Sequence, residues 1–110
     1  MSQDLAKKRC IPIAGGMAPI GSAKAREMAA AVPGWSVSSD AKALERHFKF
    51  KDFAKALIFV NRVGGVAEQE GHHPDVAFGW GYVNLSLQTR AIGGLHENDF
   101  ILAAKINQLL

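Results

Sequence analysis

The stretch DVAFGWGYVNLSLQTR, residues 75–90, decides the fold. Its second half alternates between an apolar side, with Val83, Leu85 and Leu87, and a polar side. A period of two residues is typical of a strand with one face against a core. We therefore predict strands over residues 75–80 and 82–90, and the one-sided pattern favours antiparallel pairing.

Two more strands are predicted upstream. Residues 35–38 form a short apolar-polar run with Trp35 and Val37 on one face, and residues 43–50 alternate in the same way. The polar sequence SSDAK between them is typical of a turn. Together these runs predict a hairpin.

Three helices are predicted, over residues 23–32, 52–69 and 97–110. Ser22 is a candidate cap for the first, and Pro33-Gly34 stops it. In the long second helix we expect an apolar stripe, which Phe53, Leu57, Val60 and Ala67 form and Ala56, Phe59 and Val63 widen. Gly64-Gly65 weakens this helix. Either a neighbour packs closely there or the helix breaks.

This order predicts an α+β domain over residues 22–110, in two layers: a four-stranded antiparallel sheet with three helices on one face. Residues 1–21 are rich in proline and glycine and are expected to be irregular. The other sheet face is polar but carries Tyr82. Open strand edges invite pairing, so we expect a homo-oligomer.

Bulk properties exclude several classes of protein. The chain has 110 residues, of which 48% are hydrophobic and 21% charged, which is ordinary for one globular domain. Neither a secretory signal nor a run long enough to cross a membrane is visible. The single cysteine, Cys10, suits a reducing compartment, so a cytoplasmic protein is expected. The short basic run Lys7-Lys8-Arg9 is read as a solvated tail rather than a nucleic-acid patch.

The pair His72-His73 is the main candidate for chemistry. Adjacent residues of an extended segment point to opposite sides, which argues against one metal ion bound by both rings. Cys10 has no sequence context of a nucleophile. Histidine titrates near neutrality and suits proton transfer. Two interpretations therefore remain: acid/base catalysis, or a surface pair without a role.

A set of spaced residues points to a family. They are Glu68, the run His72-His73-Pro74, Trp80 and Asp99. The segment that holds them, EQEGHHPDVAFGWGYVNLSLQTRAIGGLHENDFILAAKINQL (residues 68–109), resembles the pterin-4a-carbinolamine dehydratase family. The preceding FKFKDFAKALIFVNRVGG is similar as well, so the resemblance covers residues 33–109.

The resemblance implies a function. Family members are dimers or tetramers that remove water from 4a-hydroxytetrahydropterin to give quinonoid dihydropterin, with histidines as proton donor and acceptor and with no metal or cofactor. Carried over, it implies catalytic roles for His72, His73 and the residue at position 90. Substrate-binding roles fall to Glu68, Pro74, Trp80 and Asp99. From the residues alone, Asp99 has a second reading, in which it completes a capping box with His96 at the start of the last helix.

One position departs from the family pattern. The third active-site histidine of the family falls on Arg90. Arginine stays protonated and is no base, but it can donate hydrogen bonds to a pterin carbonyl. Two hypotheses follow: a dehydratase in which Arg90 orients the ring, or a catalytically weakened member that acts as an assembly or transcriptional-cofactor module, as the mammalian member also does.

Overall fold

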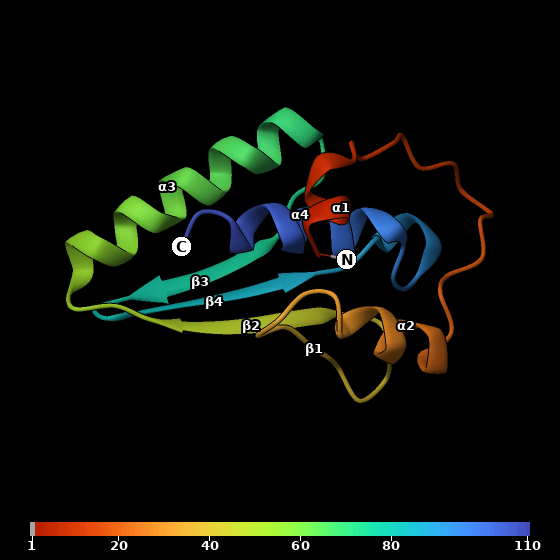
Figure 1. The fold of residues 1–110 in the computed structure, drawn as a ribbon, viewed down its shortest axis with the longest axis horizontal. Coiled ribbons are helices and arrows are strands. Elements are labelled where there is room, and N and C mark those ends of the chain that lie inside the picture. Colours follow the sequence, from red (N-terminus) through yellow and green to blue (C-terminus); the bar gives the residue numbers. More distant parts are fainter. Residues whose placement is uncertain (1) are drawn as a thin grey trace.

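One four-stranded antiparallel sheet and four α-helices make up residues 2–110, which the computed structural model describes (Figure 1). The strand order is β1-β2-β4-β3, so β1 and β3 are the edges. The strands are β1 (Ser36–Val37), β2 (Leu44–Lys49), β3 (Asp75–Gly79) and β4 (Tyr82–Leu87). The predicted α+β class with its antiparallel sheet is confirmed.

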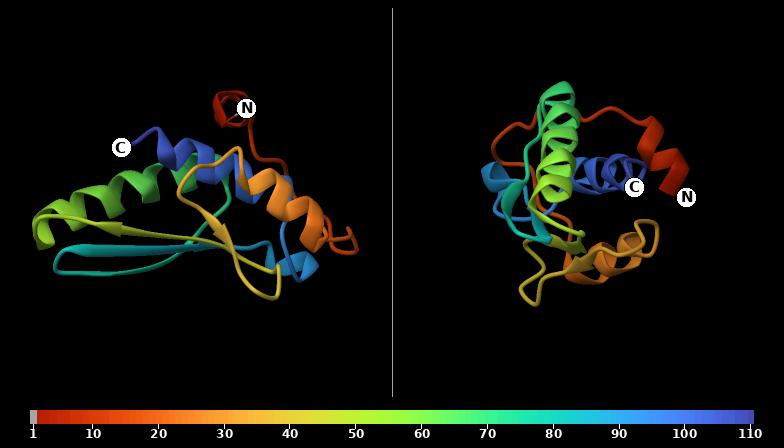
Figure 2. Two further views of the ribbon diagram at one scale, coloured as in Figure 1. Left: turned by 60° about the horizontal axis from the view of Figure 1, so that its bottom comes forward. Right: turned by 90° about the vertical axis from the view of Figure 1, so that its left-hand side faces the viewer.

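Two of the four helices cover one face of the sheet, and the other two lie outside this layer. They are α1 (Ser2–Lys7), α2 (Ser22–Ala29), α3 (Phe53–Glu70) and α4 (Glu97–Asn107). Figure 2 shows α3 and α4 against one face of the sheet and α2 beside β1, while α1 lies on the side of α4 away from the sheet. No helix among residues 2–110 is long and apolar enough to cross a membrane.

The N-terminal segment differs from the prediction. An irregular chain was expected over residues 1–21, but Ser2–Lys7 is helical, and Met1 lies outside the described residues. Ala6 of this helix is buried, and its carbonyl oxygen accepts a hydrogen bond from Lys105 Nζ of α4 at 2.6 Å. Because α1 covers its outer side, α4 is buried almost all round.

The hairpin of β3 and β4 follows the pattern in its sequence. Phe78 lies opposite Val83 and Asp75 opposite Ser86. Val83, Leu85 and Leu87 are buried against the helices, whereas the side chain of Asn84 points to the open face. The predicted last strand was too long, because the chain leaves the sheet after Leu87 and forms a 3₁₀ turn, η1 (Arg90–Ile92).

Helix α3 is continuous through Gly64-Gly65, so the alternative of a helix break is excluded. The close-packing explanation also fails, because a Cβ added at either glycine would meet no atom within 4 Å among the described residues. Asp52 caps the helix by accepting a hydrogen bond from Lys55 N at 2.9 Å. At the other end Gly71 has a φ of 65°, a left-handed conformation that glycine adopts without strain.

The predicted apolar stripe of α3 is displaced by one helical position. The buried residues are Ala56, Phe59, Val63 and Ala67. The first three were expected only at the border of the stripe, and Ala67 was expected in the stripe itself. Phe53 and Leu57 are instead exposed at the flank beside β3, where the Phe53 ring stacks on Phe78. Apolar periodicity alone does not tell a core face from an apolar flank.

The ends of α2 and α4 also differ from prediction. Ser22 is the first helical residue rather than the cap, and its Oγ accepts a hydrogen bond from Arg26 Nε at 3.2 Å. Helix α2 ends three residues before the predicted end, and α4 does the same. The predicted capping box of α4 is present: His96 Nδ1 accepts from Asn98 N at 2.9 Å, and Asp99 Oδ2 accepts from His96 N at 3.0 Å.

Candidate active site

A hollow of about 330 Å³ lies where α3 gives way to β3. The loop after Gly71 brings His72 and His73 to it, because the left-handed glycine ends α3 and turns the chain. The other walls come from the chain after β4, at Gln88 to Ala91, from the first turn of α4, at Asn98, and from the N-terminal segment at residues 11–13. Four segments distant in sequence therefore meet at this hollow.

His72 is held by a buried carboxylate. Its Nε2 lies 2.5 Å from Asp99 Oδ1, and the exposed fractions of the two side chains are 11% and 0%. When the neutral ring donates from Nε2 to a carboxylate, Nδ1 becomes the nitrogen with a lone pair. This contact therefore sets both the ring orientation and the nitrogen that can accept a proton.

Asp99 joins three parts of the chain. Besides His72, it accepts a hydrogen bond from Thr89 Oγ1 at 2.8 Å and completes the capping box of α4 through His96 N. Thr89 is itself buried. Asp99 is not among the residues that line the hollow, so its route to a ligand is through His72.

His73 has a different environment. Its Nε2 contacts Glu68 Oε2, one turn from the end of α3, and the exposed fractions of the side chains are 59% and 78%. His73 lines the hollow, whereas Glu68 reaches it only through the histidine. The two adjacent rings thus have separate carboxylate partners on separate elements.

Arg90 lines the hollow from the start of the 3₁₀ turn. Its guanidinium donates to Asp75 Oδ2 at 2.6 Å, and both side chains are exposed. This hydrogen bond, reinforced by the charge of Asp75, raises the pKa of Arg90 above its already high value. Arg90 is consequently a permanent cation and hydrogen-bond donor at the mouth of the site.

Two predicted site residues stand apart from the hollow. Trp80 is 72% exposed in the turn between β3 and β4, at the end of β3 opposite to the histidines. Within one chain it is not brought under a ligand in this hollow. Pro74 joins His73 to β3 and is absent from the lining.

Several lining residues were missed from the sequence. They are Ile11, Pro12 and Ile13 of the N-terminal segment, and Asn98 of α4. No local pattern marks them, because their contacts join positions 87 residues apart. The nearby Cys10 is half-buried, and burial, helped by the negative charge of Glu70, raises the pKa of its thiol to about 12. The thiol stays protonated at neutral pH and is a poor nucleophile.

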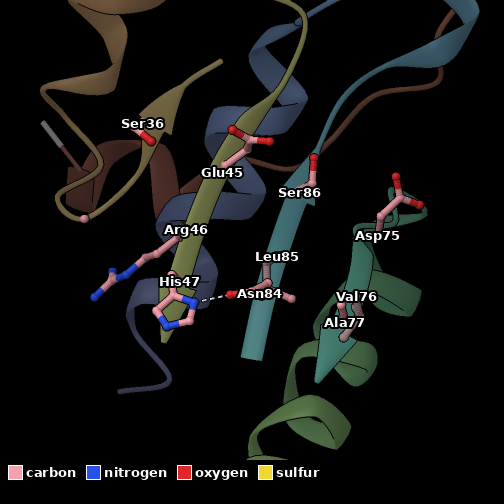
Figure 3. A pocket seen from close by; sticks show the side chains of 11 residues that line it. Ser36, Glu45, Arg46, His47, Asp75, Val76, Ala77, Asn84, Leu85 and Ser86 are labelled. Carbon is pink, nitrogen blue, oxygen red and sulfur yellow. Dashed lines mark hydrogen bonds between the residues drawn. The ribbon is translucent and has the colours of Figure 1, made fainter. Parts of the chain in front are cut away.

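A larger hollow of about 600 Å³ lies elsewhere, over the open face of the sheet (Figure 3). His47 of β2 and Asn84 of β4 form a hydrogen bond there, in the row of this sheet face next to the one that holds Glu45 and Asp75. It holds one histidine, whose ring is bound to an amide and not to a carboxylate. The smaller hollow has two histidine–carboxylate pairs and is the better acid/base site. Among the described residues, no group of three or more His, Cys, Asp or Glu side chains is arranged to hold a metal ion.

Comparison with known sequences agrees with this geometry. The sequence model of the family described as pterin 4 alpha carbinolamine dehydratase matches residues 18–109. A protein of Halorhodospira halophila with a provisional pterin-4-alpha-carbinolamine dehydratase name is 52% identical over 105 residues, 96% of each chain. A similarly named protein of Cupriavidus pinatubonensis is 47% identical over 109 residues, 99% of this chain and 94% of the other.

Solved structures show the same fold. A transcriptional coactivator/pterin dehydratase from Brucella melitensis is 31% identical, with a TM-score of 0.77 over 83% of this chain and 97% of the other. A pterin dehydratase-like protein, identified as a RuBisCO assembly factor in the alpha-carboxysome, is 26% identical, with a TM-score of 0.59 over 69% of this chain and 88% of the other. From its sequence and its fold, the chain belongs to the pterin-4a-carbinolamine dehydratase family.

Proposed function

We propose that this protein dehydrates a 4a-hydroxytetrahydropterin to the quinonoid dihydropterin, as a step of tetrahydrobiopterin recycling. The observation that carries the proposal is the pair His72 and His73 at one hollow, each with its own carboxylate. Two oriented imidazoles are what a reaction with one proton delivered and one removed requires.

The reaction balances without an oxidant or reductant. The bond between C4a and the hydroxyl oxygen breaks, and that oxygen takes a proton and leaves as water. The ring nitrogen N5 gives up its proton, and its electrons form the double bond to C4a. His72 and His73 exchange these two protons, while the Arg90 guanidinium donates hydrogen bonds that orient the ring. Asp99 positions His72 rather than touching the ligand.

The test is dehydration of enzymatically generated 4a-carbinolamine, followed by the absorbance of the quinonoid product. We expect a rate well above buffer, and a fall of about 10²- to 10⁴-fold in His73→Ala, typical of a lost acid/base group. His47→Ala on the open sheet face is the matched control and should keep the full rate. A wild-type rate equal to that of buffer would refute the proposal.

A second candidate function is an assembly or cofactor module with weakened catalysis. Arg90 favours it, because this side chain is engaged with Asp75 at the surface, and the described residues that line the hollow include no third histidine. Arg90→His distinguishes the two functions. A gain of orders of magnitude in dehydratase rate would support the module, whereas an unchanged or lower rate would support catalysis with arginine in place.

We also propose a cytoplasmic homodimer or homotetramer. In support, the edge strand β3 exposes Val76, and Phe53 and Leu57 of α3 lie exposed along the flank beside it. Val76→Lys should lower the mass found by light scattering to that of a smaller assembly. Ile58→Lys, at an equally apolar exposed position of α3 away from β3, should not. A monomeric wild-type protein would refute this proposal.

A further inference from the structure

The N-terminal segment passes along the histidine hollow at residues 10–13, here called the strap, of which residues 11–13 line the hollow. It lies before residue 18, where the match to the family begins. Figure 1 shows the N-terminal segment passing the end of α3 on its way from α1 to α2. Ile11, Pro12 and Ile13 line the hollow together with the loop that carries His72 and His73. The strap is therefore part of the site wall.

A buried asparagine fixes the position of the strap. Asn98 Oδ1 accepts a hydrogen bond from Ile11 N at 3.0 Å, and Asn98 Nδ2 donates to Ile11 O at 2.8 Å. Both main-chain groups of Ile11 are thus paired with one side chain that has 2% exposure. A buried amide with both ends satisfied holds its partner in one register, because any shift leaves polar groups unpaired.

A carboxylate provides a second anchor. Glu70, whose side chain is 5% exposed, accepts a hydrogen bond from Cys10 N at 2.8 Å and binds Arg9 Nε at 3.0 Å. Burial alone would raise the pKa of Glu70, but the Cys10 hydrogen bond and the charges of Lys105 and Arg9 together lower it. The anchor is therefore ionised at neutral pH.

The walls of the hollow differ in chemistry. The histidine loop and the chain after β4 supply ring nitrogens, an amide, a hydroxyl and a guanidinium, whereas the strap supplies aliphatic side chains. Ile11 is 53% exposed although its main chain is fixed, so its side chain is held in place with apolar surface still uncovered. Burying such a surface under the carbon atoms of a ligand makes the free energy of binding more favourable.

A reduced pterin has a polar pyrimidinone edge and, opposite to it, a carbon edge at C6 and C7 that carries the substituent. We propose that the strap is the specificity-determining wall of this site and that Ile11 and Ile13 receive the carbon edge and the C6 substituent. This inference rests on the proposed function. The polar edge then faces Arg90 and Gln88, where hydrogen-bond donors and acceptors are available.

The first test compares two substrates, the 4a-carbinolamines of tetrahydrobiopterin and of tetrahydropterin, which has no C6 substituent. In Ile11→Ala and Ile13→Ala, KM for the substituted substrate should rise about fivefold, the expected result of losing part of one apolar contact. Turnover number should not change, because contact of this kind is the same in ground and transition states. KM for the unsubstituted substrate should change less. The control is Ile58→Ala on α3, which has the same exposure as Ile11 and should have wild-type constants.

The second test addresses the anchor. Glu70 is absent from the lining of the hollow, so Glu70→Gln changes the site only through the strap. We expect a higher KM with unchanged turnover, together with faster hydrogen exchange of the Ile11 main-chain N–H, which reports that the strap has opened. Wild-type KM together with a wild-type exchange rate at Ile11 would overturn the anchoring role.

Equilibrium binding of 7,8-dihydrobiopterin, measured by calorimetry, separates failure of this inference from failure of the proposed function. A wild-type protein that binds but does not turn over would refute the dehydratase while the dissociation constants of the Ile11 and Ile13 variants still test the strap. A change below twofold in both variants, in KM or in dissociation constant, would overturn the strap assignment and leave the dehydratase intact. Absence of both binding and turnover would refute both.

Discussion

His72 and His73 are neighbours in sequence and both bind a carboxylate, but their surroundings are opposite. The His72–Asp99 pair is buried at the junction of the histidine loop, the chain after β4 and α4. The His73–Glu68 pair is exposed on the last turns of α3. Removing a buried acceptor that several donors share is strongly destabilising, whereas an exposed pair contributes little. The His72–Asp99 pair therefore contributes to the stability of the fold as well as to the site, whereas the His73–Glu68 pair contributes to the site alone.

The largest effect should come from Asp99→Ala. It leaves His72, Thr89 and the main-chain N–H of His96, which are buried or partly buried, without their acceptor. We expect the free energy of unfolding in urea to fall by about 3–5 kcal/mol, because each donor left unpaired costs about 1–3 kcal/mol. Asp99→Asn, which keeps the shape, should lose less. If Asp99→Ala and Asp99→Asn both had wild-type stability, the buried pair would contribute no more to folding than the exposed pair, contrary to this prediction.

Thr89→Val tests one contact of the buried pair at constant shape. It removes the hydroxyl that donates to Asp99 and leaves the carboxylate in place. A hydrogen bond to a charged group contributes about 1.5–3 kcal/mol, so unfolding should require correspondingly less urea. Thr89 is not proposed to move a proton. If dehydratase activity falls as much as it does in His73→Ala, Thr89 has a more direct role than Asp99 positioning.

Low pH should remove the contribution of Glu70 to the stability of the folded state. Glu70 is a buried carboxylate two residues after Glu68 of the exposed pair. The pKa of Glu70 is lower in the folded chain than its ordinary value, so ionised Glu70 stabilises the folded state above the ordinary carboxyl range. That contribution is lost as the pH falls through the folded pKa. Relative to wild type, Glu70→Gln should therefore be destabilised at pH 7, and the difference should shrink toward pH 3. A difference that is constant across this range would contradict the assignment.

The smallest effect on stability should come from Glu68→Ala. The pair with His73 is exposed and screened by solvent, so the free energy of unfolding should change by less than about 1 kcal/mol. Activity is the sharper readout, because loss of the carboxylate frees the His73 ring to rotate. A large loss of stability here would mean that the two pairs are equivalent after all.

The regular part of the fold could be predicted from local patterns. Alternation identified the four strands, and the capped start of the last helix was predicted from His96 and Asp99. Helix α1 could not be found in the same way. Its six residues are mostly polar, and it is stabilised by packing on α4, about a hundred residues later.

The site was predictable only in part, for the same reason. His72, His73 and Arg90 lie at one hollow, as the resemblance implied, but the partners of these residues depend on contacts across the fold. The 3₁₀ turn that carries Arg90 orients its side chain toward Asp75, and no local sequence pattern predicts this contact. Trp80 was expected near the ligand from spacing, yet a strand of five residues separates it from the histidine loop.

Asp99 also has a consequence for how the sequence can change. Because a single carboxylate orients a histidine and starts the last helix, a substitution there alters folding and chemistry together, and selection cannot adjust one without the other. Arg90 is the opposite case. Its side chain is in solvent and its partner Asp75 is exposed, so replacing it costs the fold little. New substrate preferences in this scaffold should therefore arise first at the rim and last at the carboxylate beneath it.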